Sequence, residues 1–126
     1  MSNVRASLNV SQDDDSKVVL LNYADPRSPS TLFTVATVDQ VPTRASWRQL
    51  TDGNPQVRGF ALGDEEEISW KSTDGKTVGG ILIKPVGYRA GTRYPLIVAI
   101  HGGPAAADVL GFNGGYGAQT YAGAGY

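Results

Sequence analysis

Hydrophobic and β-branched residues occur along this chain in short runs that are separated by polar turns. Residues 17–23 and 31–38 are two such runs, rich in Val, Leu and Thr, and prolines lie between them at positions 26 and 29. Runs of this length and composition predict strands, and the prolines predict a turn. We therefore expect a strand, a turn and a second strand in the first third of the chain.

Two acidic clusters interrupt this pattern. Residues 1–15 are polar and end in three consecutive aspartates, which is typical of a solvated loop. Residues 64–67 are one aspartate followed by three glutamates. Because like charges repel unless water screens them, we interpret this second cluster as a solvated linker rather than as a catalytic pair of carboxylates. The linker predicts a domain boundary between residues 1–63 and residues 64–126.

The second part of the chain begins with a hairpin pattern. Polar and apolar residues alternate over residues 68–72, and an Asp-Gly pair at 74 and 75 supplies a tight turn. Residues 77–85 are then expected to form the second strand of the hairpin. Residues 94–100 are apolar at almost every position. A strand that is apolar on both faces predicts a central place in a sheet, with helices above and below it. Residues 116–122 predict a short helix next to several glycines.

The composition excludes several classes of function. With 40% hydrophobic and 18% charged residues the chain is typical of a globular protein, and its net charge of −1 argues against a nucleic-acid partner. No apolar run reaches the roughly 18 residues of a membrane-spanning helix, and residues 1–12 lack the apolar core of a secretory signal. There is no cysteine, metal-binding cluster or phosphate-binding loop, so we expect no metal and no cofactor. These features assign neither a compartment nor an oligomeric state.

The candidate chemistry lies directly after residues 94–100. There the chain continues as His101, Gly102, Gly103 and Pro104. Glycines lack a Cβ, so the backbone N–H groups of such a turn can approach a substrate closely. Pre-oriented N–H groups stabilise the anionic oxygen that forms during acyl transfer. This turn is therefore a candidate oxyanion loop.

The rest of a serine hydrolase site is missing from the residues after the loop. On an α/β sheet, a serine, an acid and a histidine would come after the loop, in that order. Residues 102–126 contain one acid, Asp108, but neither a serine nor a histidine. We therefore interpret the chain as part of an enzyme rather than as an enzyme by itself.

Five short segments succeed one another in a distinctive order. They read WRQLT, EISWKSTDG, LIKP, YPLIV and HGGP, at residues 47–51, 67–75, 82–85, 94–98 and 101–104. Together they resemble the prolyl oligopeptidase family of serine peptidases, in its acylaminoacyl-peptidase-like branch. In that family a β-propeller precedes an α/β-hydrolase domain. The resemblance implies that residues 1–63 are a β-rich part like the end of a propeller, and that residues 64–126 are the first strands of an α/β-hydrolase domain.

The resemblance also implies a reaction and a site. The intact enzyme would hydrolyse short peptides through an acyl-enzyme, and its catalytic Ser, Asp and His would lie beyond Tyr126, with no catalytic residue and no metal ligand in this chain. The N–H of Gly103 would be an oxyanion donor, and Gly102 and His101 would shape the loop. His101 is the only histidine, but its place before the loop implies a structural rather than a catalytic role.

Two alternatives stay open at this point. An esterase or lipase of the same hydrolase fold usually carries H-G-G-G in this loop, whereas this chain has Pro104 in place of the third glycine. A non-catalytic, β-rich interaction protein would instead be complete at this length. Apolar strands with unpaired edges tend to aggregate, so we also predict that the isolated chain is poorly soluble or loosely packed.

Overall fold

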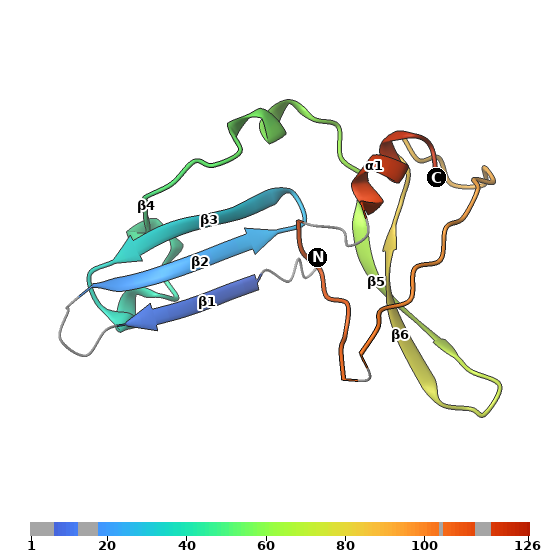
Figure 1. Ribbon diagram of the computed structural model, residues 1–126, viewed down its shortest axis with the longest axis horizontal. Coiled ribbons are helices and arrows are strands. Elements are labelled where there is room, and N and C mark those ends of the chain that lie inside the picture. Colours follow the sequence, from blue (N-terminus) through green and yellow to red (C-terminus); the bar gives the residue numbers. More distant parts are fainter. Residues whose placement is uncertain (1–6, 13–17, 104, 113–116) are drawn as a thin grey trace.

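The part of the chain that the structure describes contains six strands in two antiparallel sheets and one short α-helix (Figure 1). The computed structural model describes residues 7–12, 18–103, 105–112 and 117–126. The strands are β1 Ser7–Gln12, β2 Val19–Asp25, β3 Ser28–Val35, β4 Arg48–Gln49, β5 Glu65–Lys71 and β6 Thr77–Ile83. The α-helix is α1 Ala118–Gly123, and three 3₁₀ turns are η1 Val38–Gln40, η2 Arg44–Ser46 and η3 Pro55–Gly59. The first sheet has the order β1-β2-β3-β4, and β5 pairs with β6 in the second.

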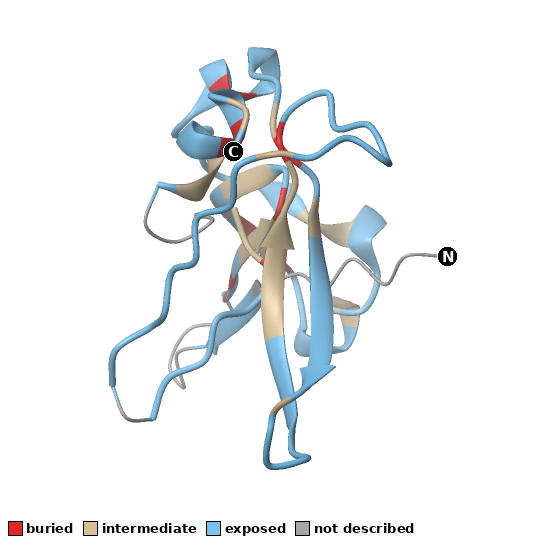
Figure 2. Ribbon diagram, turned by 90° about the vertical axis from the view of Figure 1, so that its right-hand side faces the viewer, coloured by how far each residue is buried: buried red, intermediate tan, exposed pale blue. Residues whose placement is uncertain are grey.

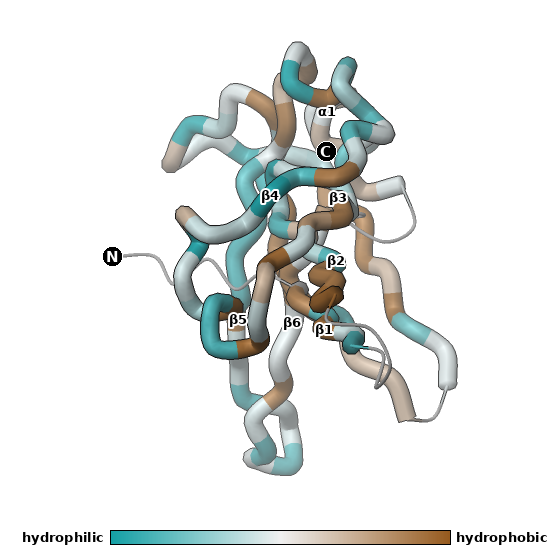
Figure 3. The backbone as a smooth tube through the Cα atoms, turned by 90° about the vertical axis from the view of Figure 1, so that its left-hand side faces the viewer, coloured by the Kyte–Doolittle hydropathy of each residue, from teal (hydrophilic) through white to brown (hydrophobic). Residues whose placement is uncertain are grey.

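One apolar face holds the first sheet together. Across β2 and β3, Val19 pairs with Val35 and Leu21 pairs with Phe33, and all four side chains are buried. Alternate residues of a strand point to opposite faces, so Leu20 lies on the other face, where it is 39% exposed. Hydrophobic stretches of the tube mark these two strands in Figure 3. The predicted strand, turn and strand are confirmed, with the proline-containing turn between β2 and β3.

An aromatic cluster covers this apolar face. Trp47 follows directly after η2, and its ring centroid lies 5.5 Å from those of both Tyr23 and Phe33. The indole N–H donates a 2.9 Å hydrogen bond to the Val41 carbonyl, which fixes the orientation of the ring. Aromatic pairs of this kind add about 0.5–1.5 kcal/mol beyond the burial of their area. Trp47 therefore packs the segment with η1 and η2 onto the sheet.

The predicted hairpin forms the second sheet. Its register runs from the pair Glu65 and Ile83 to the pair Lys71 and Thr77. At the turn, Gly75 has a φ of 81°, which a glycine adopts without strain. Figure 2 shows that the end of the hairpin near this turn is exposed, whereas the end near α1 is partly buried. The hairpin pattern in the sequence is confirmed.

Helix α1 packs against the partly buried end of the hairpin. The Val86 N–H donates a 3.0 Å hydrogen bond to the carbonyl of Ala122, whose side chain is 2% exposed. Gly63 lies at the same contact, where a Cβ would be 2.2 Å from the Lys84 carbonyl oxygen and 2.8 Å from the Ala122 Cβ. Only glycine fits this position without movement of its neighbours. The predicted helix is confirmed, and its docking depends on a close backbone approach.

Two segments predicted to be loops are strands instead. Strand β1 lies within the polar stretch 1–15, because all six of its residues find register partners on β2; the three aspartates that end this stretch lie outside the described residues. The glutamates at 65–67 belong to β5 rather than to a solvated linker. Strand alternation sends neighbouring carboxylates to opposite faces, and Glu66 pairs with Lys84 at 2.9 Å. The domain boundary between residues 63 and 64 stays a prediction.

The prediction that residues 94–100 form a central strand is wrong for the described structure. No strand is assigned there, and Leu96, Val98 and Ile100 are 73%, 72% and 83% exposed. An extended segment becomes part of a sheet only when a neighbouring strand takes up its backbone hydrogen bonds. No described strand pairs with this segment. The described residues contain one α-helix, so they do not supply the helices expected above and below it.

The overall β-rich class is confirmed. Four sequential antiparallel strands are also what one blade of a β-propeller contains, but the described residues form no closed ring of blades and no parallel sheet. The propeller and α/β-hydrolase assignments therefore stay predictions. Within the described part of the chain, no helix has the length and apolar character needed to cross a membrane.

Candidate functional site

The candidate oxyanion loop is an exposed turn after the apolar segment 94–100. His101, Gly102 and Gly103 are all exposed. The ring nitrogen Nδ1 of His101 lies 3.0 Å from the Gly102 carbonyl oxygen. A carbonyl oxygen can only accept a hydrogen bond, so the ring carries its proton on Nδ1 and donates it.

This hydrogen bond acts on the peptide unit that matters for the chemistry. The Gly102 carbonyl and the Gly103 N–H belong to the same planar amide. A hydrogen bond to the oxygen of an amide polarises the group and makes its N–H a better donor. The His101 ring is therefore hydrogen-bonded to the amide whose N–H is the candidate oxyanion donor.

The backbone at Gly103 requires glycine. Its φ is 151°, a value that residues with a side chain rarely adopt, and a Cβ there would lie 3.0 Å from the Ala105 nitrogen and 3.4 Å from the Ala106 Cβ. By contrast, a Cβ at Gly102 would meet nothing within 4 Å. Among the hydrogen bonds of the described residues, none uses the Gly103 N–H. With respect to the described residues, this N–H is available to an external acceptor.

The structure does not join these residues to a proton relay. His101 has a hydrogen bond only to Gly102 within the described part of the chain, and no described serine hydroxyl or carboxylate contacts its ring. Two cavities of the molecule are lined by the first sheet and its flanking loops, and neither includes this turn. Pro104 lies outside the described residues. By geometry the turn can donate a hydrogen bond to an anion, and none of the residues that the structure describes places a nucleophile in contact with it.

Sequence reasoning missed a polar network between β5, α1 and the segment before the helix. The side-chain amide of Gln119 accepts a hydrogen bond from the Gly63 N–H at 2.8 Å and donates one to the Gly63 carbonyl at 3.1 Å. It also donates to Glu65 Oε1 at 3.2 Å, and the Gly111 N–H donates to Glu65 Oε2 at 3.4 Å. Only the position of Gln119 within the predicted helix pointed to this network in the sequence.

Burial raises the pKa of the Glu65 carboxyl above its ordinary value. The hydrogen bonds from Gln119 and from the Gly111 N–H oppose this shift, because they stabilise the ionised form. Glu65 thus links the second sheet to α1 through a carboxyl group that ionises less easily than one in water. Within the acidic cluster of the sequence, Glu65 is therefore a structural carboxylate rather than a solvated one.

Sequence reasoning also missed an arginine within the aromatic cluster of the first sheet. The guanidinium carbon of Arg44 lies 4.2, 4.5 and 4.1 Å from the ring centroids of Tyr23, Phe33 and Trp47. Arg44 and Trp47 are three residues apart around a 3₁₀ turn, where side chains at that spacing lie above one another. That spacing was the available signal. Burial, together with a 3.0 Å hydrogen bond to Asp25, raises the pKa of the Tyr23 hydroxyl.

Comparison with known proteins adds a relative. The chain is 34% identical over 91 residues to a Bacillus subtilis (strain 168) protein named uncharacterized peptidase YuxL. The matched region is 71% of this chain but 13% of that relative, so the chain spans a small part of the relative's length. No family model and no solved structure matches the chain. The chain is therefore similar to one section of a protein that is named as a peptidase.

Proposed function

We propose that this chain is the section of a serine peptidase that supplies one oxyanion donor, as in the prolyl oligopeptidase family. The observation that carries the proposal is the 34% identity with a protein named as a peptidase. The free N–H of Gly103 and the left-handed backbone there support the same assignment. The four-stranded antiparallel sheet ahead of the loop agrees with a propeller blade.

The loop has one task in the proposed reaction. A serine oxygen supplied by another part of the peptidase attacks the peptide carbonyl carbon, and the carbonyl oxygen becomes an anion. The Gly103 N–H donates a hydrogen bond to that oxygen, and His101 keeps the amide in place through the Gly102 carbonyl. The second donor is the N–H of the residue after the serine. One such donor contributes about 2.7–4 kcal/mol to the stability of the transition state.

The class of substrate follows from the family resemblance. The intact peptidase would release N-terminal or acylated residues from short peptides. Its substrates would be short because a propeller in front of the catalytic domain admits only small or unfolded chains.

The coding sequence past Tyr126 tests the proposal first. We expect an in-frame Gly-x-Ser-x-Gly stretch, followed by an acid and a histidine. A stop codon directly after Tyr126 would instead favour a non-catalytic interaction protein. In the product that contains the serine, Gly103→Ala should lower kcat by about 10²–10³-fold, because strain displaces the donor. The matched control is Gly59→Ala, since a Cβ at Gly59 meets nothing within 4 Å; an unchanged kcat in Gly103→Ala would contradict the assignment.

A further inference from the structure

A shallow cavity of about 190 Å³ lies on the covered face of the first sheet. It is formed between β2, β3 and the loop that contains η3. The residues of its wall that matter here are two aromatic rings, three arginines and one acid: Tyr23, Phe33, Arg27, Arg44, Arg58 and Asp52. The candidate oxyanion loop does not line it. The cavity is therefore a separate feature of the molecule with a positive lining.

Two of the three arginines are neutralised within the chain. Arg58 pairs with Asp52 at 2.8 Å, and Arg27 pairs with Asp64. Arg44 has no carboxylate partner among the described residues, and its charge lies over aromatic rings instead. The cavity thus presents one guanidinium whose charge no described acid compensates.

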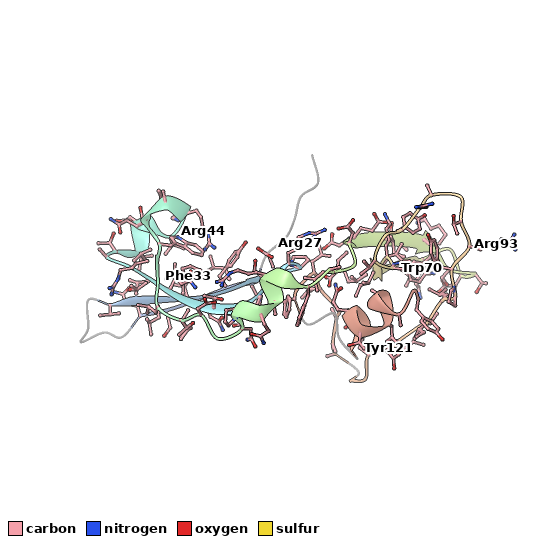
Figure 4. The ribbon with its side chains drawn as sticks, turned by 90° about the horizontal axis from the view of Figure 1, so that it is seen from above. Arg27, Phe33, Arg44, Trp70, Arg93 and Tyr121 are labelled. Atoms are coloured by element: carbon pink, nitrogen blue, oxygen red, sulfur yellow. The ribbon has the colours of Figure 1, made fainter. Side chains whose placement is uncertain are left out.

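The rings leave the hydrogen-bonding edge of Arg44 available. An arginine has five N–H donors in the plane of its guanidinium group. Three ring centroids within 4.5 Å restrict how this group can turn, and in the described part of the chain none of its N–H groups donates a hydrogen bond to the protein. Figure 4 shows Arg44 beside Phe33, at the end of the first sheet that is far from the hairpin. A planar fork held in this way fits the two oxygens of a carboxylate.

We propose that Arg44 anchors a binding site for a carboxylate group of a peptide, with Tyr23 and Phe33 as its apolar walls. Pockets that enclose a whole small ligand measure about 300–1,000 Å³. At about 190 Å³ this cavity accepts one residue, either the last residue of a peptide or an acidic side chain. The proposal rests on the cavity and on the ring contacts of Arg44, and it does not depend on the proposed reaction.

Trp47 provides the readout for the test. The chain has two tryptophans, so Trp70→Phe leaves Trp47, which contacts Arg44, as the only one. N-acetyl-Ala-Leu, which has a free carboxylate, is titrated into the Trp70→Phe chain at submicromolar protein concentration. N-acetyl-Ala-Leu amide, which lacks that carboxylate, is titrated in parallel. N-acetyl-Asp-Leu amide is the third probe. We expect saturable fluorescence changes with at least one acid, and binding of N-acetyl-Ala-Leu amide that is weaker by at least about tenfold. N-acetyl-Ala-Leu carries its carboxylate at the chain terminus and N-acetyl-Asp-Leu amide carries it on a side chain, so comparing the two acids shows which source the site binds.

Substitutions decide whether Arg44 is the anchor. Arg44→Gln should remove saturable binding, and Arg44→Lys, which keeps the charge but not the fork, should weaken it. Arg48→Gln is the matched control, because Arg48 pairs with Thr34 on β3 and does not line this cavity. Circular dichroism checks that each variant keeps its strands. Equal binding of acid and amide, full binding by Arg44→Gln, loss of binding in Arg48→Gln alone, absence of any saturable signal, or a parent chain without strands would each overturn the proposal.

Discussion

At the scale of single residues, the proposed role of the loop rests on one amide. His101 donates to the Gly102 carbonyl, and the same amide offers the free N–H of Gly103. In the proposed reaction, this arrangement would let His101 contribute without exchanging a proton with the substrate. The proposal therefore gives His101 a positioning role and assigns the general base to another residue.

The pH profile of a His101 variant tests this distinction. In the intact peptidase, His101→Asn should lower kcat by less than about tenfold, because a general base is worth about 10²–10⁴-fold and this residue is not one. The ionisation that appears in kcat/KM near neutral pH should remain. If that ionisation disappeared together with the activity, His101 would be the catalytic base and the assignment of the loop would be wrong.

Glu65 is the second residue whose chemistry the structure changes. Its pKa is raised by burial, so its contribution to the free energy of unfolding is largest below its ordinary pKa of 4.5 and is lost as pH rises through the raised pKa. A ¹³C titration of the side-chain carboxyl should therefore give a midpoint above 4.5. Gln119→Leu should raise it further, because the lost amide hydrogen bond favours the ionised form. A midpoint at or below 4.5 in the parent chain would contradict the prediction that burial dominates the pKa of this carboxyl.

At the scale of elements, the docking of α1 depends on the absence of a side chain at Gly63. The carbonyl of Lys84 and the methyl of Ala122 fill the space that a Cβ would need. Gln119 pairs with both backbone groups of the same glycine. The helix has six residues, too few to be stable in water by itself. It forms because it packs here.

Gly63→Ala measures this packing. Overpacking of this kind costs about 1–3 kcal/mol, so we expect faster amide exchange at Val86, whose N–H bonds to the helix. Amides in the middle of β2 should keep their protection. Gly59→Ala is the control, since it has open space around it. Unchanged exchange at Val86 in Gly63→Ala would mean that the helix docks by other contacts.

The whole molecule combines one small core with a large exposed apolar segment. The core of the first sheet consists of four buried side chains and the residues packed on them. Residues 94–100 lie outside it, with Ile100 83% exposed. Exposed apolar segments with free backbone groups are sites of association. The predicted low solubility of the isolated chain therefore has its cause in this segment.

Sedimentation of lysine variants tests that cause. The parent chain should associate at micromolar concentration, and the double variant Val98→Lys with Ile100→Lys should sediment as a monomer. Val38→Lys, at another exposed valine, should not change the association. A monomeric parent chain, or equal association of all three chains, would contradict this prediction.

How far the sequence predicts this molecule depends on whether a feature is local. The hairpin and the β2–β3 pair were predictable, because alternation and turn residues are adjacent in the chain. Residues 94–100 were not, because an apolar run becomes a strand only beside a partner strand, and no described segment supplies one. In the candidate site, the turn at Gly103 was predictable from its glycines. The ring cluster around Arg44 was not, because its rings come from separate segments.

Intact-mass spectrometry after treatment with a fluorophosphonate tests the central claim, that this chain carries an oxyanion donor without the nucleophile it serves. Fluorophosphonates form a covalent bond only with a serine that a neighbouring base activates. We predict that the mass of the 126-residue chain stays unchanged. A stoichiometric adduct on any serine of the chain would contradict this claim and would identify a complete catalytic site within these residues.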